Sequence, residues 1–288
     1  MSRRLEGRLN VTSAAIAACL GFTASTPVLA QQAVQWRVEN GGNGHWYMIA
    51  VQAQTSWYAF REIALAQGGE LASLGSSAEH AFVRGLAFNT PSAFVGVYGP
   101  FVGGFQDTLE SDFSEPGGGW RWSDGTPWAY TGWHPAGEPN NCLSTCSGAC
   151  VAENVIQLYS ASYGGYWNDI SPAPAICGGG WIATASVFEW SADCDGNGIV
   201  DYGEILDGTL TDTNANGVPD CCDAGVSCDP CPGDLNASNT VDAEDLAYVL
   251  FAWGTDGGKT PEADIDRSGT VDANDLSIVL GSWGPCPN

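Results

Sequence analysis

Acidic and amide side chains recur at fixed spacing in the last third of the sequence. In four windows of twelve residues, oxygen-bearing side chains occupy positions 1, 3, 5, 9 and 12, and Gly or Asn stands at position 6, where the chain must turn sharply. A loop of this kind can wrap its carboxylates and amides around one hard cation, and the number and spacing of the oxygens suit Ca²⁺. The sequence therefore predicts four calcium-binding loops.

The predicted ligands divide among these four loops. Loop one contributes Asp193, Asp195, Asn197, Asp201 and Glu204. Loop two contributes Asp212, Asn214, Asn216, Asp220 and Asp223. Loop three contributes Asp234, Asn236, Ser238, Asp242 and Asp245, and loop four contributes Asp264, Asp266, Ser268, Asp272 and Asp275. The competing interpretation is a solvated acidic linker, but 14 of the 19 acidic residues after Ser191 stand at ligand positions, which calcium explains better.

Loops three and four each lead into a short predicted helix. The 21 residues that begin at Asp234 recur thirty residues later with 12 identities. In both copies, apolar residues fall at i, i+3, i+4 and i+7, which is one face of a helix. These residues are Leu246, Val249, Leu250 and Trp253 in the first copy and Leu276, Val279, Leu280 and Trp283 in the second. Since neither helix can bury its stripe alone, we expect the two to pack together.

The paired loop-helix units over residues 231–288 resemble a dockerin module. The resemblance implies a small all-α, EF-hand-like region that binds calcium and docks a cohesin-like protein partner. Ser or Thr often makes the docking contacts in that family, whereas Ala243-Glu244 and Ala273-Asn274 stand at those positions here. Loops one and two, within residues 192–230, resemble the calcium-stiffened spacers of thrombospondin type 3 repeats.

A second group of motifs lies upstream. Glu138-Pro139-Asn140 and Trp167-Asn168-Asp169 follow one another in the chain, after Gly68–Leu74 and the Trp-rich stretch Trp120–Pro127. Taken in this order, the series resembles the C-type lectin domain over about residues 33–190. The resemblance implies an α+β fold with two helices, small antiparallel sheets and long calcium-binding loops, here within residues 31–191.

The resemblance also implies a ligand set with a cis peptide bond before Pro139. The expected calcium and carbohydrate ligands are Glu138, Asn140, Glu153, Asn168 and Asp169. Three carboxylates and two amides leave coordination positions for two vicinal hydroxyls of a sugar, and the same groups can accept from and donate to those hydroxyls. In the family, the Glu-Pro-Asn order goes with mannose, glucose, N-acetylglucosamine or fucose rather than galactose.

Regular elements must position these motifs. Residues 45–51 predict a strand, and residues 56–66 predict a helix that a Ser or Thr caps and that Gly68-Gly69 ends. A second short helix is expected over residues 77–87 and a buried strand over residues 94–97. Beyond Gly117 the chain reads as long loops rich in Gly, Pro and Trp, which usually carry function or support a metal.

Cysteines and the first thirty residues predict export. Residues 1–30 have a basic start, an apolar stretch and small residues before a cleavage site after Ala30, as in a signal peptide. Alternative interpretations are a lipoprotein anchored at Cys19 or a twin-arginine signal. Ten cysteines follow, an even number that favours disulfides. Three lie in an insertion between Asn140 and Glu153, and two flank the last module and could bridge it. These are Cys142, Cys146 and Cys150, with Cys177 after the last ligands, and then Cys231 and Cys286.

The charge excludes some classes of partner. A net charge of −24 disfavours nucleic acid and anionic membranes, and no stretch after the signal is apolar for long enough to span a membrane. We also find no Ser-His-Asp arrangement, HExxH motif or P-loop, so we do not expect an enzyme. The favoured hypothesis is a secreted or cell-surface, calcium-dependent protein that binds glycans. The alternative is an adhesion or scaffold protein whose lectin-like fold binds another protein.

Overall fold

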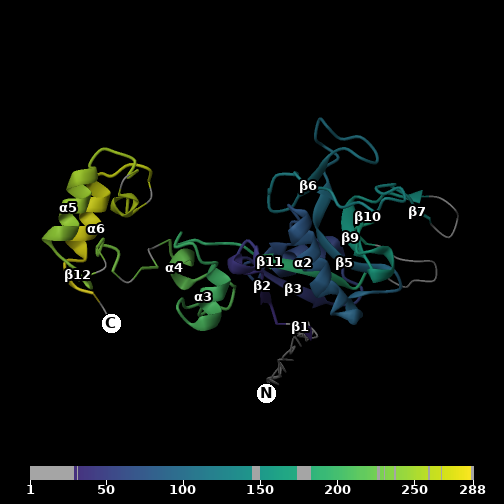
Figure 1. The fold of residues 1–288 in the computed structure, drawn as a ribbon, viewed down its shortest axis with the longest axis horizontal. Helices are drawn as coiled ribbons and strands as arrows, with labels where there is room; N and C mark the ends of the chain where they lie inside the picture. Colours follow the sequence, from purple (N-terminus) through teal and green to yellow (C-terminus); the bar gives the residue numbers. More distant parts are fainter. Residues whose placement is uncertain are drawn as a thin grey trace, which may run out of the picture.

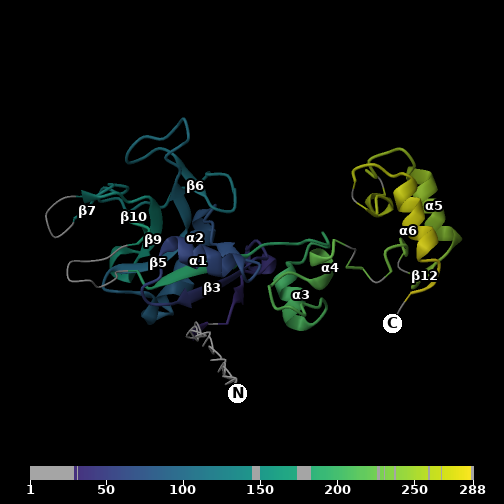
Figure 2. The same ribbon diagram turned by 180° about the vertical axis from the view of Figure 1, so that it is seen from behind.

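The molecule consists of three parts in a row. Figures 1 and 2 show a domain built around a sheet, a small unit with α3 and α4, and a distal unit with α5 and α6. No helix in the described part of the chain is long and apolar enough to cross a membrane. Most of the expected signal segment, Cys19, Cys146 and Cys177 lie outside the described residues. The computed structural model describes residues 29–30, 32–144, 150–173, 183–225, 228–229, 231–236, 238–258, 260–266 and 268–286.

One twisted sheet organises the first domain. Its main strands lie in the order β1 (Leu29–Ala30), β3 (Trp46–Val51), β11 (Ala185–Trp190), β5 (Tyr98–Gln106), β9 (Val155–Tyr159) and β10 (Trp167–Ile170). Three short strands pair at the sides: β2 (Val34–Gln35) with β3, β4 (Glu70–Leu71) with β11, and β6 (Trp120–Trp122) with β5. The β5–β11 pair is parallel and the other pairs are antiparallel. Strands β7 (Leu143–Ser144) and β8 (Cys150–Val151) form a separate pair.

Helices α1 and α2 each begin at a Ser cap. Helix α1 (Trp57–Leu65) starts after Ser56, whose hydroxyl accepts the Ala59 N–H at 3.2 Å. Helix α2 (Ser77–Phe88) starts after Ser76, which accepts the Glu79 N–H at 3.1 Å. Both expected helices and the expected strand over residues 45–51 are therefore confirmed. Short 3-10 turns are η1 (Val38–Asn40), η2 (Pro91–Ala93), η3 (Ala161–Tyr163) and η4 (Pro261–Ala263).

The strand expected over residues 94–97 is wrong. Gly96 has φ of 64°, and the backbone groups of Val95 and Tyr98 bond to each other across a tight turn. The strand β5 starts only at Tyr98. An apolar run that contains a glycine in the left-handed region turns the chain instead of extending it.

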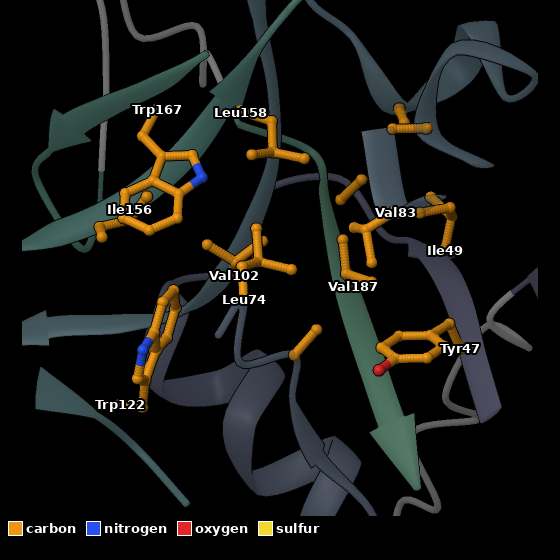
Figure 3. Packing of buried hydrophobic residues seen from close by; sticks show 14 of the residues in the cluster. Tyr47, Ile49, Leu74, Val83, Val102, Trp122, Ile156, Leu158, Trp167 and Val187 are labelled. Atoms are coloured by element: carbon orange, nitrogen blue, oxygen red, sulfur yellow. The ribbon is translucent and has the colours of Figure 1, made fainter. Parts of the chain in front are cut away.

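Both faces of the sheet are buried. Successive side chains of a strand point to opposite faces, and apolar residues occupy both sets of positions. In β11, Val187 belongs to the cluster under α2, whereas Phe188 belongs to the cluster under α1. Figure 3 shows the α2-side cluster, in which Tyr47, Ile49 and Val187 lie beside one another and Trp167 extends the packing towards β10. The two helices therefore cover opposite faces of one sheet.

The distal unit pairs two capped helices. Asp242 caps α5 (Ala243–Ala252) and Asp272 caps α6 (Ala273–Gly281), each within a capping box. Strand β12 (Thr240–Val241) in the first repeat pairs with strand β13 (Gly284–Pro285) at the end of the second. The helices pack together as expected, with a small core that includes Val249 and Val279.

The expected apolar stripe of these helices is only half right. Val249 and Val279 are buried, but Leu250, Trp253, Leu280 and Trp283 are each about half exposed. The helices are short, and Val241 of β12 and Val271 from the loop before α6 complete the core. The buried face is therefore narrower than a four-position stripe requires.

Disulfides link the described cysteines after the first domain. Cys194 bonds to Cys222, and Cys221 bonds to Cys228. The expected bridge between Cys231 and Cys286 is present and joins the two ends of the distal unit. Helices α3 (Asp201–Asp207) and α4 (Asp220–Asp223) lie in the segment that the first two bridges hold together. Cys142 is also disulfide-bonded.

Candidate functional site

Two antiparallel strands present the lower half of the candidate site. Strands β9 and β10 pair so that Asn168 lies opposite Gln157 and Asp169 opposite Ile156. Trp167 beneath them is fully buried and lies against the rings of Trp122, Trp128, Tyr130 and Trp133. This aromatic packing fixes β10, so the two polar residues that follow Trp167 have defined positions.

A long loop supplies the upper half. The backbone of His134 donates to the Trp167 carbonyl at 3.0 Å, which attaches the loop to β10. The peptide bond between Glu138 and Pro139 is cis, as expected. The carboxylate of Asp169 then accepts the backbone N–H groups of Asn140, at 3.0 and 3.1 Å, and of Asn141, at 2.7 Å.

All five predicted ligands join one hydrogen-bonded network. The Asn140 amide donates to Glu138. The N–H of Cys142 donates both to the Asn140 side-chain oxygen and to Glu153, each at 2.8 Å. Glu153, Asn168 and Asp169 are buried on the strand side, whereas Glu138 is half-buried and Asn140 is exposed. The network is therefore open to solvent on its loop side.

Tyr159 is a site residue that the sequence analysis missed. Its hydroxyl lies 2.9 Å from Glu138 Oε1 and 2.6 Å from Asn168 Oδ1, so it can donate to either ligand. Asn141 is a second one, because its side-chain oxygen accepts the Glu153 N–H at 2.8 Å. The signal for Tyr159 is that it shares one face of β9 with Gln157, two residues before it. Only the strand register, however, reveals its neighbour on β10.

Burial raises the pKa values of the three carboxyl groups. At Glu153, burial and the charges of Asp169 and Glu138 raise the pKa to about 8. Burial is also the largest cause of the raised pKa values of Glu138 and Asp169. Within the described residues, none of the three forms an ion pair with Lys, Arg or His.

These observations fit a divalent cation. Buried carboxylates are costly unless a cation or metal compensates them, and carboxylate and amide oxygens are the donors that calcium prefers. Among the described residues, the oxygens of Glu138, Glu153 and Asp169 do not form a cluster within 4.8 Å, in contrast to those of loops one and four. Backbone N–H groups of residues 140–142 donate to the carboxylates of Asp169 and Glu153 and so occupy part of their accepting capacity.

The acidic loops gather their ligands to different degrees. In loop one, carboxylate oxygens of Asp193, Asp195 and Asp201 lie within 4.8 Å of one another, and in loop four those of Asp264, Asp266 and Asp275 do so. Glu204 Oε2 and Asp264 Oδ1 are buried without a hydrogen-bond partner. Unpartnered carboxylate oxygens at two predicted ligand positions are suited to bind a cation.

In loops two and three, the last acidic residue accepts hydrogen bonds from side-chain amides or backbone N–H groups of the same loop. In loop two, Asp223 accepts the side-chain amides of Asn214 and Asn216 at 2.9 and 2.8 Å. In loop three, Asp245 accepts the N–H groups of Leu235 and Asp242, both at 2.9 Å. The predicted ligands of each loop are therefore close in space, although other groups occupy some of their oxygens.

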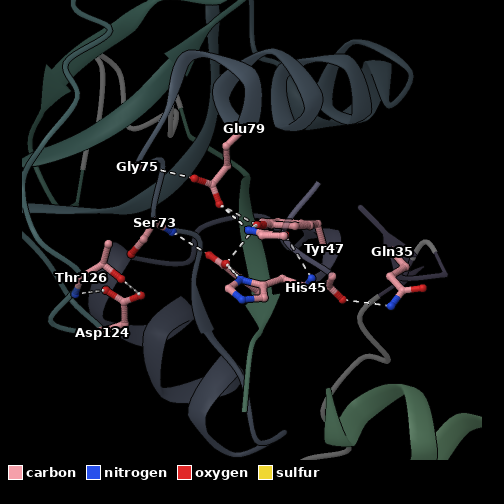
Figure 4. Close-up of polar contacts among 11 residues, drawn as sticks. Gln35, His45, Tyr47, Ser73, Gly75, Glu79, Asp124 and Thr126 are labelled. Atoms are coloured by element: carbon pink, nitrogen blue, oxygen red, sulfur yellow. Dashed lines mark hydrogen bonds and ion pairs between the residues drawn. The ribbon is translucent and has the colours of Figure 1, made fainter. Parts of the chain in front are cut away.

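A separate buried polar cluster lies towards the opposite edge of the sheet from β9 and β10. The hydroxyl of Tyr47 lies 2.7 Å from Glu79 Oε1 and 3.0 Å from Glu189 Oε1, so it can donate to either carboxylate, and His45 Nδ1 lies 2.6 Å from Glu189 (Figure 4). The second oxygens of the two carboxylates accept backbone N–H groups of Gly75 and Ser73. Every carboxylate oxygen of this cluster has a partner, so the cluster joins β3, α2 and β11 as a structural element.

Comparison with known proteins gives one curated relative. The chain is 32% identical over 124 residues to Ladderlectin of Oncorhynchus mykiss, which covers 42% of this chain and 54% of Ladderlectin. The chain therefore spans about half the length of this relative. No family model matches.

Solved structures are also similar to part of the chain. The carbohydrate-recognition domain of cow CD23, solved with an oligosaccharide, is 22% identical and covers 52% of this chain and 91% of that domain, with a TM-score of 0.37. A calcium-independent type II antifreeze protein is 23% identical and covers 52% and 88%, with a TM-score of 0.36. The likeness to Ladderlectin supports a C-type-lectin-like domain over about half of the chain.

Proposed function

We propose that the chain is a secreted or cell-surface protein that binds glycans through calcium held by Glu138, Asn140, Glu153, Asn168 and Asp169. The observation that carries the proposal is the single network that joins these five side chains, with three buried or half-buried carboxylates and no basic partner among the described residues. Calcium would bind here as a hard cation, and its free coordination positions would take two sugar hydroxyls.

The specificity follows from the loop residues. Asn140 can donate through its amide and Glu138 can accept, which are the two roles that a vicinal diol needs from its neighbours. The Glu-Pro-Asn order of the lectin resemblance supports mannose-type sugars. Titration on a glycan array, with calcium and then with EDTA, should give mannose-type binding only with calcium. Binding that survives EDTA, or a strong preference for galactose, would contradict the proposal.

An exchange of the two loop ligands tests the same point. The double variant Glu138→Gln, Asn140→Asp swaps the acceptor and the donor while it retains the oxygen count. We expect its preference to shift from mannose towards galactose in competition with an immobilised ligand. A variant with unchanged preference would show that these residues do not contact the sugar.

The distal unit is proposed to attach the chain through calcium loops three and four. Five exposed apolar side chains on or beside its helices support a protein-facing surface, namely Leu250, Phe251, Trp253, Leu280 and Trp283. A cohesin-like partner is what the dockerin resemblance implies. Immobilised cohesin domains should retain the full chain in calcium and release it in EDTA, and no retention would leave the unit with a different partner.

A further inference from the structure

The spacer (residues 192–230) contacts the C-type-lectin-like domain with its first loop. Val200 belongs to the same buried cluster as Phe188 and Trp190. The ring of Tyr202 stacks on Trp190, with centroids 4.3 Å apart and an interplanar angle of 22°, and meets the edge of Trp46 at 5.7 Å. The sequence boundary at Ser191 is therefore not a boundary in packing.

Loop two makes a second contact. Gly217, with φ of 78°, lies so close to Gln67 and Gly68 that any side chain there would collide with the Gln67 carbonyl. The same carbonyl accepts the indole N–H of Trp190 at 2.7 Å. The disulfide between Cys194 and Cys222 joins loop one to the last residues of loop two. Both loops thus face the end of α1 and the end of β11.

The acidic side chains of loop one lie close to one another at the start of α3. Oxygens of Asp193, Asp195 and Asp201 lie within 4.8 Å of one another. Glu204 is only 3% exposed, and its Oε2 has no hydrogen-bond partner. Its Oε1 accepts the Asn197 amide at 2.8 Å, and the same amide donates to Asp195 at 3.1 Å, which directs Glu204 towards the cluster.

The positions of the ligands along the chain connect the cluster to the contact. Asp201 and Glu204 stand in the first turn of α3, and Tyr202 lies between them. Within the described residues, no Lys, Arg or His pairs with these carboxylates. Without a cation, four like charges repel one another at the point where α3 starts, whereas a shared cation draws them together and fixes the direction of the helix.

We propose that loop one binds a divalent cation, calcium by its all-oxygen donors, and that this cation fastens α3 and Tyr202 onto Trp46 and Trp190. The proposal rests on the proposed calcium binding of the acidic loops, but it does not depend on the sugar site. Calcium at loop one would make the spacer a rigid joint between the glycan-binding domain and the distal unit, so that calcium sets the direction in which the sugar site points.

The first test needs no variant. Hydrogen exchange of the full chain is followed by mass spectrometry in calcium and in EDTA. Calcium should slow exchange about tenfold in α3 and in the segments that carry Trp46 and Trp190, because ordering of the loop is coupled to metal binding. Equal exchange of these segments in calcium and in EDTA would overturn the proposal.

Two variants locate the cation. Glu204→Gln keeps the side-chain shape and removes the buried charge, so it should lose the calcium protection of α3. Asp207→Asn is the matched control, because Asp207 lies in the same helix, is exposed and is not a predicted ligand. Calcium protection that persists in Glu204→Gln, or that is lost equally in Asp207→Asn, would contradict a site at loop one.

Tyr202→Ala separates cation binding from fastening. It should retain the calcium protection of α3 but lose that of the segments around Trp46 and Trp190; retention of both would contradict the joint. Glu138→Gln should lose glycan binding and keep the joint. If the wild-type chain binds no glycan but calcium still protects α3 and Trp190, the proposed function fails and the joint stands. Calcium-dependent glycan binding without protection of α3 refutes the joint alone.

Discussion

Tyr159 connects the two halves of the candidate site through one hydroxyl group. The hydroxyl faces Glu138 from the loop and Asn168 from β10, and it has one proton to donate. Burial and the nearby Glu138 charge raise the pKa of Tyr159, so the proton remains available. A residue that orients metal ligands without binding the metal commonly contributes tenfold or more to metal affinity.

Tyr159→Phe should therefore weaken calcium and glycan binding about tenfold and leave the fold intact, because the ring stays and only the hydroxyl is lost. Calorimetric titration with calcium measures the effect. Tyr163→Phe is the control, since Tyr163 packs on Tyr159 but is 43% exposed. Equal affinities of the Tyr159 variant and the wild-type chain would refute the orienting role.

The sequence predicts which residue types form the candidate site but not which of them are hydrogen-bonded to one another. The two tripeptides and Glu153 predict a ligand set because acidic and amide residues recur in a recognisable order. Tyr159 and Asn141 could not be predicted, because their roles depend on the β9–β10 register and on the left-handed turn at Asn141. Contacts between residues far apart in sequence require the fold.

At the scale of elements, β10 depends on the packing of one side chain. Trp167 is fully buried among aromatic rings that include Trp122 of β6 and Trp133, and the two predicted ligands Asn168 and Asp169 follow it directly. Removal of a buried Trp leaves a cavity that neighbouring side chains fill only in part. The stability of the strand and the geometry of the site are therefore coupled.

Trp167→Ala should lower the free energy of unfolding by about 3–5 kcal/mol and abolish glycan binding. Trp253→Ala is the matched control, because Trp253 is 45% exposed at the end of α5, and its cost should stay below about 1 kcal/mol. Urea denaturation followed by fluorescence measures both variants. Similar losses in the two variants would show that burial of Trp167 does not stabilise the domain.

The cluster of His45, Tyr47, Glu79 and Glu189 predicts a pH dependence. Burial lowers the pKa of His45, but the hydrogen bond and charge of Glu189 outweigh it, so the pKa is raised overall. The folded state then binds the proton more tightly than the unfolded state. The resulting stability is present below the ordinary His pKa of about 6.5 and is lost as the pH rises through the raised value.

His45→Gln should therefore cost more unfolding free energy at about pH 5.5 than at about pH 9. Burial lowers the pKa of His80, so His80→Gln should show the opposite trend and serves as the control. Denaturation curves at the two pH values decide the matter. A cost of His45→Gln that is the same at both pH values would mean that His45 does not bind its proton more tightly in the folded state than in the unfolded state.

Local signals predicted some elements and not others. The Ser cap and the glycine stop located α1 because these signals act within one turn of the chain. The expected strand over residues 94–97 was wrong because Gly96 turns the backbone. The stripe with Leu250 and Trp253 was predicted from periodicity, but which face is covered depends on the neighbouring loops.

For the whole molecule, the negative charge and its concentration in four loops favour calcium as the bound ion. The net charge is −24, and 19 of 33 acidic residues follow Ser191. Calcium in four loops would neutralise about eight of these charges. The three parts lie in a row (Figure 1), so a stiffened spacer would hold the C-type-lectin-like domain away from the distal unit.

The most direct measurement is calorimetric titration of methyl α-mannoside into the full chain, first with calcium and then with EDTA. The account predicts saturable binding of one sugar per chain with calcium and none with EDTA, because the sugar hydroxyls complete the coordination of the ion. Asp169→Asn should abolish the heat signal while the circular dichroism of the chain stays unchanged. Equal heats of binding in calcium and in EDTA would contradict the account.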